Sequence, residues 1–398
     1  MEILSPAGNF TKLKFALNYG ADAVYAAGKS FGLRAKADNF SEDELKKATE
    51  YCHNLGKKIY ITVNIYAKNV QIEKIEKYMA FLNSIQVDAL IISDVGLFLV
   101  AKEFAPDVDV HVSTQANVTS YKSAEFWYKA GAKRVILARE LSIKEISEIK
   151  EKIPDLELEM FVHGAMCIAY SGRCLLSAFF NNRSANQGLC TQPCRWKYAL
   201  TEETRPGQYF PIEEDENGTF ILNSKDLCLY DYLQQIKDAG LDSIKIEGRM
   251  KSPYYVANVT RIYKKGLELL EENKSLNPYY KEELSKVSHR VYTSGFADGF
   301  DSNDTQHYET SAYERNYQYL GEVINIDNEF IEVDIKAKFS IGDDVDFIFP
   351  DIEDDFTVTI SQIYDREGNL IEFTKPNTII RLRLENPVKE HCLLRKKI

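Results

Sequence analysis

Short apolar runs alternate with amphipathic stretches over the first 270 residues of the chain. The runs are bounded by turn residues, which is typical of strands buried on both faces of a parallel sheet. Eight of them are predicted as strands, over residues 3–8, 23–27, 58–64, 88–94, 108–113, 134–138, 156–162 and 242–247. Helices are expected between them, including 10–19, 72–85, 253–272 and one that opens with a capping box at Ser41 and Glu44.

Eight such units in this length favour a closed (β/α)₈ barrel over an open doubly wound sheet. Polar side chains near the carboxyl ends of the strands would then meet at one face of the barrel. The sequence offers the following residues there: Ser5, Tyr25, Asn64, Asp94, His111, Gln115, Arg139, Glu140, Glu159, His163, Glu247 and Arg249.

The pattern changes after the last helix of the predicted barrel. Short alternating runs separated by turn signals predict strands over 319–326, 330–338, 344–349, 356–363 and 379–384. We therefore predict a barrel domain over 1–280 with a cysteine-rich segment at 163–230, a connector over 281–316, and a small antiparallel β-barrel over 317–398.

Composition and charge leave a nucleic-acid partner open. Hydrophobic residues make up 44% of the 398 residues and charged residues 27%, as in ordinary globular proteins. Without a bilayer-length apolar run or a signal peptide, a cytoplasmic protein is expected. The net charge of −11 is uneven, because residues from Asp301 onward hold 21 acidic and 11 basic side chains. The first 300 residues are therefore nearly neutral, and a basic surface on the first domain is possible.

Five of the seven cysteines fall between residues 167 and 228. The spacing is Cys167-x₆-Cys174-x₁₅-Cys190-x₃-Cys194, with Cys228 further along. In a long chain that is expected to be cytoplasmic, cysteines clustered in this way indicate metal or redox chemistry rather than disulfides. An iron–sulfur cluster, a structural zinc ion and ordinary thiols all remain open from the spacing alone. The separate Cys52 and Cys392 are expected to be small buried hydrophobes.

Several segments resemble the collagenase-like peptidase family U32. They are 159–177 (EMFVHGAMCIAYSGRCLLS), 188–196 (GLCTQPCRW), 223–228 (NSKDLC), 246–251 (IEGRMK) and 4–8 (LSPAG). The resemblance covers nearly the whole chain. It implies either a peptidase or an RNA or quinone hydroxylation protein, because members of both kinds are known.

The compact length and C-terminal barrel resemble the branch that hydroxylates a wobble uridine of tRNA to 5-hydroxyuridine in a prephenate-dependent reaction. Relatives in ubiquinone synthesis bind a [4Fe-4S] cluster through four cysteines. Carried over by position, that set implies Cys167, Cys174, Cys190 and Cys228 as ligands here, with Cys194 as the alternative to Cys190. The expected partners are tRNA and a small anionic co-substrate such as prephenate.

Each of the other candidate residues could instead have a purely structural role. His163 is either a proton donor or second-sphere group beside the first expected ligand, or a histidine that is hydrogen-bonded in a turn. Arg249 or Arg139 is predicted to hold the anionic co-substrate, and Glu247 lies beside Arg249. An internal salt bridge of Arg249 and a rim ion pair between Arg139 and Glu140 are the alternatives. His111 is expected to be a satisfied core histidine.

Three functions therefore remain: a tRNA hydroxylase, a peptidase, and a cluster-stabilised scaffold that binds RNA or a partner subunit. The His-Glu-x-x-His motif of a metalloprotease is absent, and no spacing favours a protease nucleophile. Arginines and aromatics interleave over residues 172–205, which suits RNA, although the same aromatics could simply pack on the barrel.

Overall fold

The computed structural model describes residues 1–32, 38–166, 176–181, 183, 191, 200–201, 209–210, 225–299, 314–327 and 329–398. The chain divides into two compact units. We call one the barrel unit (Met1–Leu13, Asp22–Met250 and Arg290–Tyr313) and the other the C-terminal unit (Lys14–Ala21, Lys251–His289 and Glu314–Ile398). No helix in the described part of the chain has the length and apolar character needed to cross a membrane.

The barrel unit is built on eight parallel strands, as predicted. They are β1 (Glu2–Pro6), β2 (Ala23–Ala26), β3 (Lys58–Thr62), β4 (Ala89–Ile92), β5 (Asp109–Val112), β6 (Arg134–Ile136), β7 (Glu157–Ala165) and β11 (Ser243–Ile246). Strands β1 to β7 pair in sequence order. Strand β11 pairs with both β7 and β1, and this closes the ring. The (β/α)₈ prediction is confirmed.

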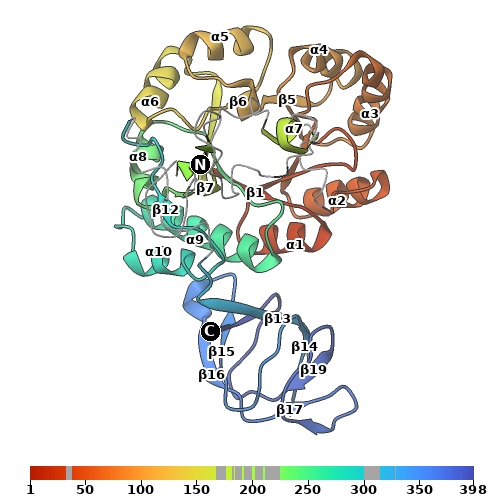
Figure 1. The fold of residues 1–398 in the computed structure, drawn as a ribbon, viewed down its shortest axis with the longest axis vertical. Coiled ribbons are helices and arrows are strands. Elements are labelled where there is room, and N and C mark those ends of the chain that lie inside the picture. The colour runs from red at the N-terminus through yellow and green to blue at the C-terminus, as the bar shows by residue number, and fades with distance from the viewer. Residues whose placement is uncertain are drawn as a thin grey trace. The chain divides into compact units, whose positions relative to one another are not determined.

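Helices surround these strands in Figure 1. They are α2 (Glu42–Asn54), α3 (Ile72–Ser84), α4 (Val95–Phe104), α5 (Tyr121–Lys129), α6 (Ile143–Lys152) and α8 (Leu233–Asp238), while α1 (Phe10–Asn18) is divided between the units. The predicted capping box at Ser41 and Glu44 opens α2, where the two side chains satisfy backbone donors that the first turn leaves free.

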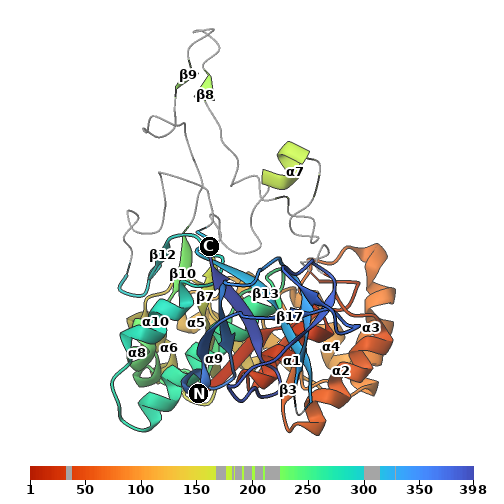
Figure 2. The ribbon, with the colours of Figure 1, turned by 90° about the horizontal axis from the view of Figure 1, so that it is seen from below.

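Strand β7 runs past the ring and starts a small second ladder. Its end pairs antiparallel with β10 (Asp226–Cys228), and β10 pairs in parallel with β12 (Tyr292–Thr293). Figure 2 shows β7, β10 and β12 gathered at one end of the strands. The sequence did not predict β10 or β12. The rest of the cysteine-rich segment is described only in α7 (Leu176–Asn181), β8 (Leu200–Thr201), β9 (Tyr209–Phe210) and a few single residues.

The C-terminal unit contains α9 (Pro253–Glu271), α10 (Pro278–Leu284) and an eight-stranded antiparallel half-barrel. Its strands are β13 (Tyr317–Ile326), β14 (Ile331–Ile335), β15 (Asp344–Ile348), β16 (Phe356–Thr359), β17 (Ile363–Tyr364), β18 (Leu370–Ile371), β19 (Ile379–Leu382) and β20 (Leu393–Lys397). Their order in the sheet is β16-β15-β20-β13-β14-β19-β17-β18. Apolar side chains of alternate strand positions fill the concave core, among them Val333, Phe347 and Leu394. Helix α10 and strands β18 and β20 were not predicted.

Candidate active site at the end of β7

Three side chains meet where β7 leaves the barrel. His163 is 1% exposed and is the direct partner of Cys228 in the β7–β10 pair. Side chains of directly opposed antiparallel residues project from the same face, with Cβ atoms roughly 4.5–5.5 Å apart. The Nε2 atom of His163 lies 3.3 Å from the hydroxyl oxygen of Tyr292 on β12. A thiol, an imidazole and a phenol therefore share one face.

Glu247 is held beside this cluster through the end of β11. Its backbone N–H donates to the carbonyl oxygen of His163 at 2.9 Å. Its carboxylate accepts a hydrogen bond from the Tyr25 hydroxyl at 3.2 Å, and the same hydroxyl lies 2.9 Å from the Ile246 carbonyl oxygen. The structure therefore brings Glu247 and His163 together, as the sequence suggested for residues at strand ends.

Arg249 is 3% exposed and is directed toward β3, where its Nη1 donates to Thr62 Oγ1 at 3.2 Å. Its carbonyl oxygen accepts a hydrogen bond from the Lys12 ammonium at 3.2 Å. The backbone of Gly8 also approaches this carbonyl so closely that a Cβ at position 8 would lie 2.3 Å from the oxygen. Contacts with residues 8–12 thus fix the backbone of Arg249, and Thr62 holds its side chain.

Arg139 reaches β7 from the end of β6. Its Nη1 donates to the carbonyl oxygen of Ala165 at 2.9 Å, and its guanidinium lies 4.0 Å from the centre of the Phe161 ring. The rim pair with Glu140 is not formed. Among the described residues, the buried atoms Arg139 Nε, Glu140 Oε2 and Gln115 Oε1 have no hydrogen-bond partner. Burial raises the pKa of Glu140. Polar atoms left unpaired beside strand ends can bind a polar ligand.

A buried ion cluster lies deeper in the barrel, in the middle of the strands. Glu159 is fully buried and bonds Arg134 at 3.0 Å and Lys245 at 3.1 Å. Burial lowers the pKa of Lys245 despite the attraction of Glu159. The sequence placed Glu159 near a strand end, but β7 continues six residues further, so this position was wrong.

His111 also lies in the barrel interior rather than at the rim. Its ring packs 4.7 Å from the ring of Tyr60, and burial together with the charges of Arg134 and Lys245 holds its pKa well below the usual range. It is a core histidine as expected, although its Nδ1 has no hydrogen-bond partner in the described parts of the chain.

The expected cluster ligands are only partly described. Cys167, Cys174 and Cys190, and the alternative Cys194, lie outside the described residues. Cys228 is half-buried at the end of β10, and Cys167 follows the last residue of β7 by two positions. The aromatic and basic residues over 172–205 also lie mostly outside, although Phe180 is described and exposed.

Cys52 and Cys392 differ from Cys228 in their surroundings. Both are fully buried, and burial raises the pKa of the Cys52 thiol to about 12 and that of Cys392 further. A thiol that resists ionisation is a poor metal ligand. The prediction that these two are core residues is confirmed, and of the three described cysteines Cys228 fits metal ligation best.

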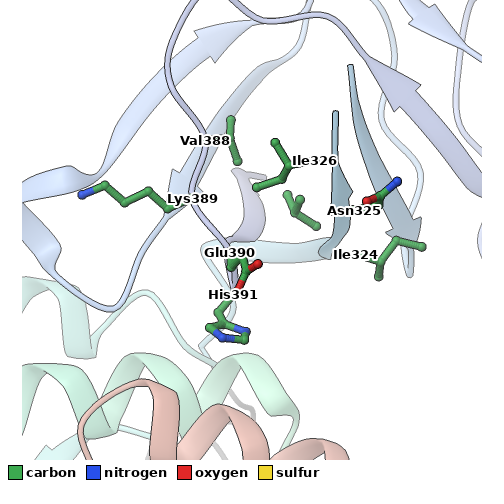
Figure 3. Close-up of a pocket in the computed structure, with 8 residues that line it drawn as sticks. Ile324, Asn325, Ile326, Val388, Lys389, Glu390 and His391 are labelled. Carbon is green, nitrogen blue, oxygen red and sulfur yellow. The ribbon is translucent and has the colours of Figure 1, made fainter. Parts of the chain in front are cut away.

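The C-terminal unit has a hollow of its own, with a volume of about 580 Å³ between the end of β13 and residues 388–391. In Figure 3 Ile326 and Val388 lie close together and Lys389 extends away from them. Lys389 pairs with Asp354, and none of the site residues predicted from the sequence lines this hollow.

Comparison with known proteins assigns the chain to a family. The model of Peptidase family U32 matches residues 8–307, and the model of the Peptidase family U32 C-terminal domain matches residues 315–395. The chain belongs to peptidase family U32. Among relatives of this U32 chain, tRNA hydroxylation protein P1 of Bacillus subtilis is 39% identical over 99% of this chain and 94% of its own.

Two further U32 relatives bear different names. The tRNA hydroxylation protein P of Escherichia coli is 36% identical, with 90% of this chain and 88% of its own covered. A protein named Collagenase from Porphyromonas gingivalis is 32% identical, with 86% and 85% covered. The predicted family is confirmed, and its members carry both hydroxylation and protease names.

Sequence reasoning missed Tyr292, Arg134 and Lys245 as parts of this region. Tyr292 lies on a two-residue strand inside the predicted connector, so no periodicity marks it. Arg134 and Lys245 lie inside predicted strands, where charged residues at alternate positions were the available signal that the barrel interior is polar.

Proposed function

We propose that this U32 protein hydroxylates a wobble uridine of tRNA to 5-hydroxyuridine in a prephenate-dependent reaction. The observation that carries the proposal is the match to tRNA hydroxylation protein P1, which spans both units and nearly the full length of each chain. The arrangement at the end of β7 supports it, because proton-carrying side chains and unpaired polar atoms gather at the face where (β/α)₈ enzymes hold their substrates.

The residues of the chain have separable roles in this proposal. The target uridine enters the barrel mouth after leaving its stack. His163 and Tyr292, joined at 3.3 Å, hold a proton beside the base, and Glu247 is fixed next to them. Arg139, whose Nε is buried and unpaired among the described residues, holds a carboxylate of the anionic co-substrate, with Arg249 as the second guanidinium.

The metal proposal rests on Cys228. With Cys167, Cys174 and Cys190 (or Cys194 in place of Cys190) this residue would bind a [4Fe-4S] cluster, which supplies one-electron chemistry when bound. Cys228 suits that role because its thiol lies at the strand end beside His163 rather than in a hydrophobic core. A zinc ion is the alternative for the same ligands.

Matched cysteine variants test the proposal. In a deletion strain complemented with the wild-type gene, nucleoside mass spectrometry of total tRNA should detect 5-hydroxyuridine or nucleosides derived from it. Cys228→Ala should abolish the signal and lower the iron content of anaerobically purified protein. Cys52→Ala, in the core of the same unit, should keep both. Unchanged hydroxyuridine in the deletion strain would refute the proposed function. Purified protein that contains zinc but no iron would show that the cysteines bind zinc instead of an iron–sulfur cluster.

A peptidase is the second candidate, and one strand pairing favours it. Cys228 and His163 project from the same face of the β7–β10 pair, and a thiol beside an imidazole is the nucleophile–base combination of cysteine proteases. The relative named Collagenase points the same way. Protein cleavage by the purified wild type that is lost in both His163→Ala and Cys228→Ala, together with normal tRNA in the deletion strain, would establish this candidate instead.

A further inference from the structure

The barrel unit also contains a hollow, of about 550 Å³, next to the carboxyl end of β2. It lies between residues 28–31, the start of α2 and one face of α3. The buried rings of Phe40 and Tyr78 line its inner part, and the half-buried rings of Phe31 and Phe81 line its outer part. The ring centres of Phe31 and Tyr78 are 5.6 Å apart, and the Tyr78 and Phe81 rings stack at 6.2 Å. Aromatic faces therefore dominate the hollow.

The backbone around the hollow carries two unusual conformations. Phe31 has a φ of 62°, in the left-handed region, where a bulky residue is strained. Such strain persists only where the surroundings hold it, and it concentrates at ligand sites. At Gly28 a Cβ would lie 2.2 Å from the Tyr78 hydroxyl oxygen, so only glycine allows this tyrosine to reach the loop. Both features keep aromatic rings at the hollow.

Positive charge surrounds these rings. Lys29, Lys74 and Lys77 line the hollow together with a single carboxylate, that of Glu42. Lys77 bonds Glu73 at 2.8 Å, but both side chains are at least three-quarters exposed, so the pair is weak. Lys29 and Lys74 have no ion-pair partner among the residues the structure describes. Ammonium groups beside exposed aromatic faces are what proteins use to bind the phosphates and bases of single-stranded nucleic acid.

We propose that this hollow binds a nucleotide of the tRNA other than the reacting uridine. Its base packs against Phe31 and Phe81, and its phosphates lie beside Lys29 and Lys74. The hollow adjoins the carboxyl end of β2, the same end of the strands at which β7 presents His163. This inference rests on the proposed function, because it requires tRNA as the substrate.

The test measures tRNA binding to the full-length protein by fluorescence anisotropy at several salt concentrations. Phe81→Ala should weaken binding about tenfold with little change in salt dependence, because it removes stacking. The double variant Lys29→Glu, Lys74→Glu should weaken binding and reduce the slope of log K against log salt by about one to two. Phe126→Ala on α5 and Lys144→Glu on α6 are matched exposed controls in the same unit and should stay within about twofold of wild type.

Phe31→Asn separates binding from folding. Asparagine tolerates positive φ, so the variant should unfold at an equal or higher temperature than wild type while it binds tRNA more weakly. Phe31→Tyr keeps the ring and should restore binding. These opposite effects on stability and affinity would not arise if Phe31 only packed the surface.

The outcomes distinguish the inference from the function on which it rests. If the wild type binds tRNA and all hollow variants bind it as tightly as the two controls, the hollow is not a tRNA-binding site, but the proposed function stands. Failure of the wild type to bind tRNA, with normal hydroxyuridine in the deletion strain, overturns both. A third outcome is that uridine monophosphate competes with tRNA for the wild type but not for Phe81→Ala, while Phe81→Ala keeps its affinity for tRNA. This result would assign the hollow to a free nucleotide and overturn the RNA assignment.

Discussion

Each unit has a fully buried glutamate that is paired with two buried cations, but these cations differ. In the barrel, Glu159 lies between Arg134 and Lys245. In the C-terminal unit, Glu283 of α10 lies between the buried Arg261 and Arg395, with distances of 3.2 and 2.8 Å. The partly exposed Lys286 also bonds Glu283. Both carboxylates are fully buried. A guanidinium keeps its proton at any accessible pH, whereas a buried lysine can lose its proton.

This difference separates a fixed cluster from a titratable one. Arg395 of β20 grips Glu283 with two nitrogens, and Arg261 of α9 also bonds Asp355 at 2.8 Å, so the C-terminal cluster ties two helices to the half-barrel. The Lys245 ammonium lies 4.4 Å from the centre of the Tyr25 ring, and the hydroxyl of that ring bonds Glu247 beside His163. We infer that the cluster around Glu283 serves stability. The cluster around Glu159 couples stability to the charge of Lys245, which lies below the candidate site.

The largest predicted effect is that of Glu283→Gln. The change removes the anion that two buried guanidiniums share. It leaves Arg261 with Asp355 and Arg395 with Asp346 as their remaining carboxylate partners, and breaking a buried pair in this way costs about 3–5 kcal/mol. Urea unfolding followed by circular dichroism should show the loss, and hydrogen exchange should locate it in peptides that contain β20. Glu282→Gln, the exposed neighbour on α10, is the matched control and should be near neutral. Equal exchange in the two variants would contradict a structural role for the cluster.

Acid should remove nearly as much stability. Burial alone would raise the pKa of Glu283, but the charges of Arg395 and Arg261 lower it from 4.5 to about 2. A carboxyl whose folded pKa is depressed stabilises the fold above its unfolded pKa, and this contribution is lost as the pH falls from 4.5 toward 2. The contribution is about 3 kcal/mol. The difference in unfolding free energy between wild type and Glu283→Gln should therefore shrink over this pH range.

The C-terminal cluster also shows why parts of the fold were not predictable. The sequence of β20, LLRKK, has no alternation of apolar and polar residues, because Arg395 is buried by a bond to Glu283, 112 positions earlier. No local pattern reveals such a partner. Helix α10 did have signals, with Asn277 as its N-cap and Pro278 in its first turn, but its seven residues were too few to show a period.

The barrel was predictable because its signal is local. Each buried strand is a short apolar run, and eight such runs specify the closed ring. Part of the site followed, since His163 and Glu247 lie at strand ends. The partnership of Cys228 and His163 did not follow, because it depends on a three-residue strand that pairs with the extension of β7. Pairing between short distant segments leaves no trace in periodicity.

Glu159→Gln should cost less than Glu283→Gln, about 2–3 kcal/mol at pH 7, because Lys245 can respond by losing its proton. Burial already lowers its pKa below 10.5, and loss of Glu159 lowers it further. Between that lowered value and 10.5 the unfolded state binds more protons, so stability rises with pH.

Urea unfolding of Glu159→Gln between pH 7 and 9.5 should therefore show partial recovery relative to wild type. Glu157→Gln is the matched control, because Glu157 bonds Arg134 but not Lys245. It should show no alkaline recovery, and neither should Glu283→Gln. Recovery in all three variants would mean that Lys245 is not the titrating group.

The smallest predicted loss of stability comes from substituting one glycine in each unit, and the two losses should be nearly equal. A Cβ at Gly8 would lie 2.3 Å from the Arg249 carbonyl oxygen, and a Cβ at Gly321 would lie 2.3 Å from the Asp334 carbonyl oxygen. The added methyl group must displace backbone in both cases, at a cost of about 1–2 kcal/mol in each. The stability losses of Gly8→Ala and Gly321→Ala should therefore be similar.

Their effects on function should differ. Gly8→Ala moves the backbone that carries Arg249, and a displacement of about 1 Å at a binding group can lower a rate by about a hundredfold. Hydroxyuridine in tRNA from the Gly8→Ala strain should therefore fall sharply, while the Gly321→Ala strain keeps most of it. Comparable protein levels on immunoblots are the control. An equal loss in the two strains would place the effect in stability alone and remove Arg249 from the substrate-binding set.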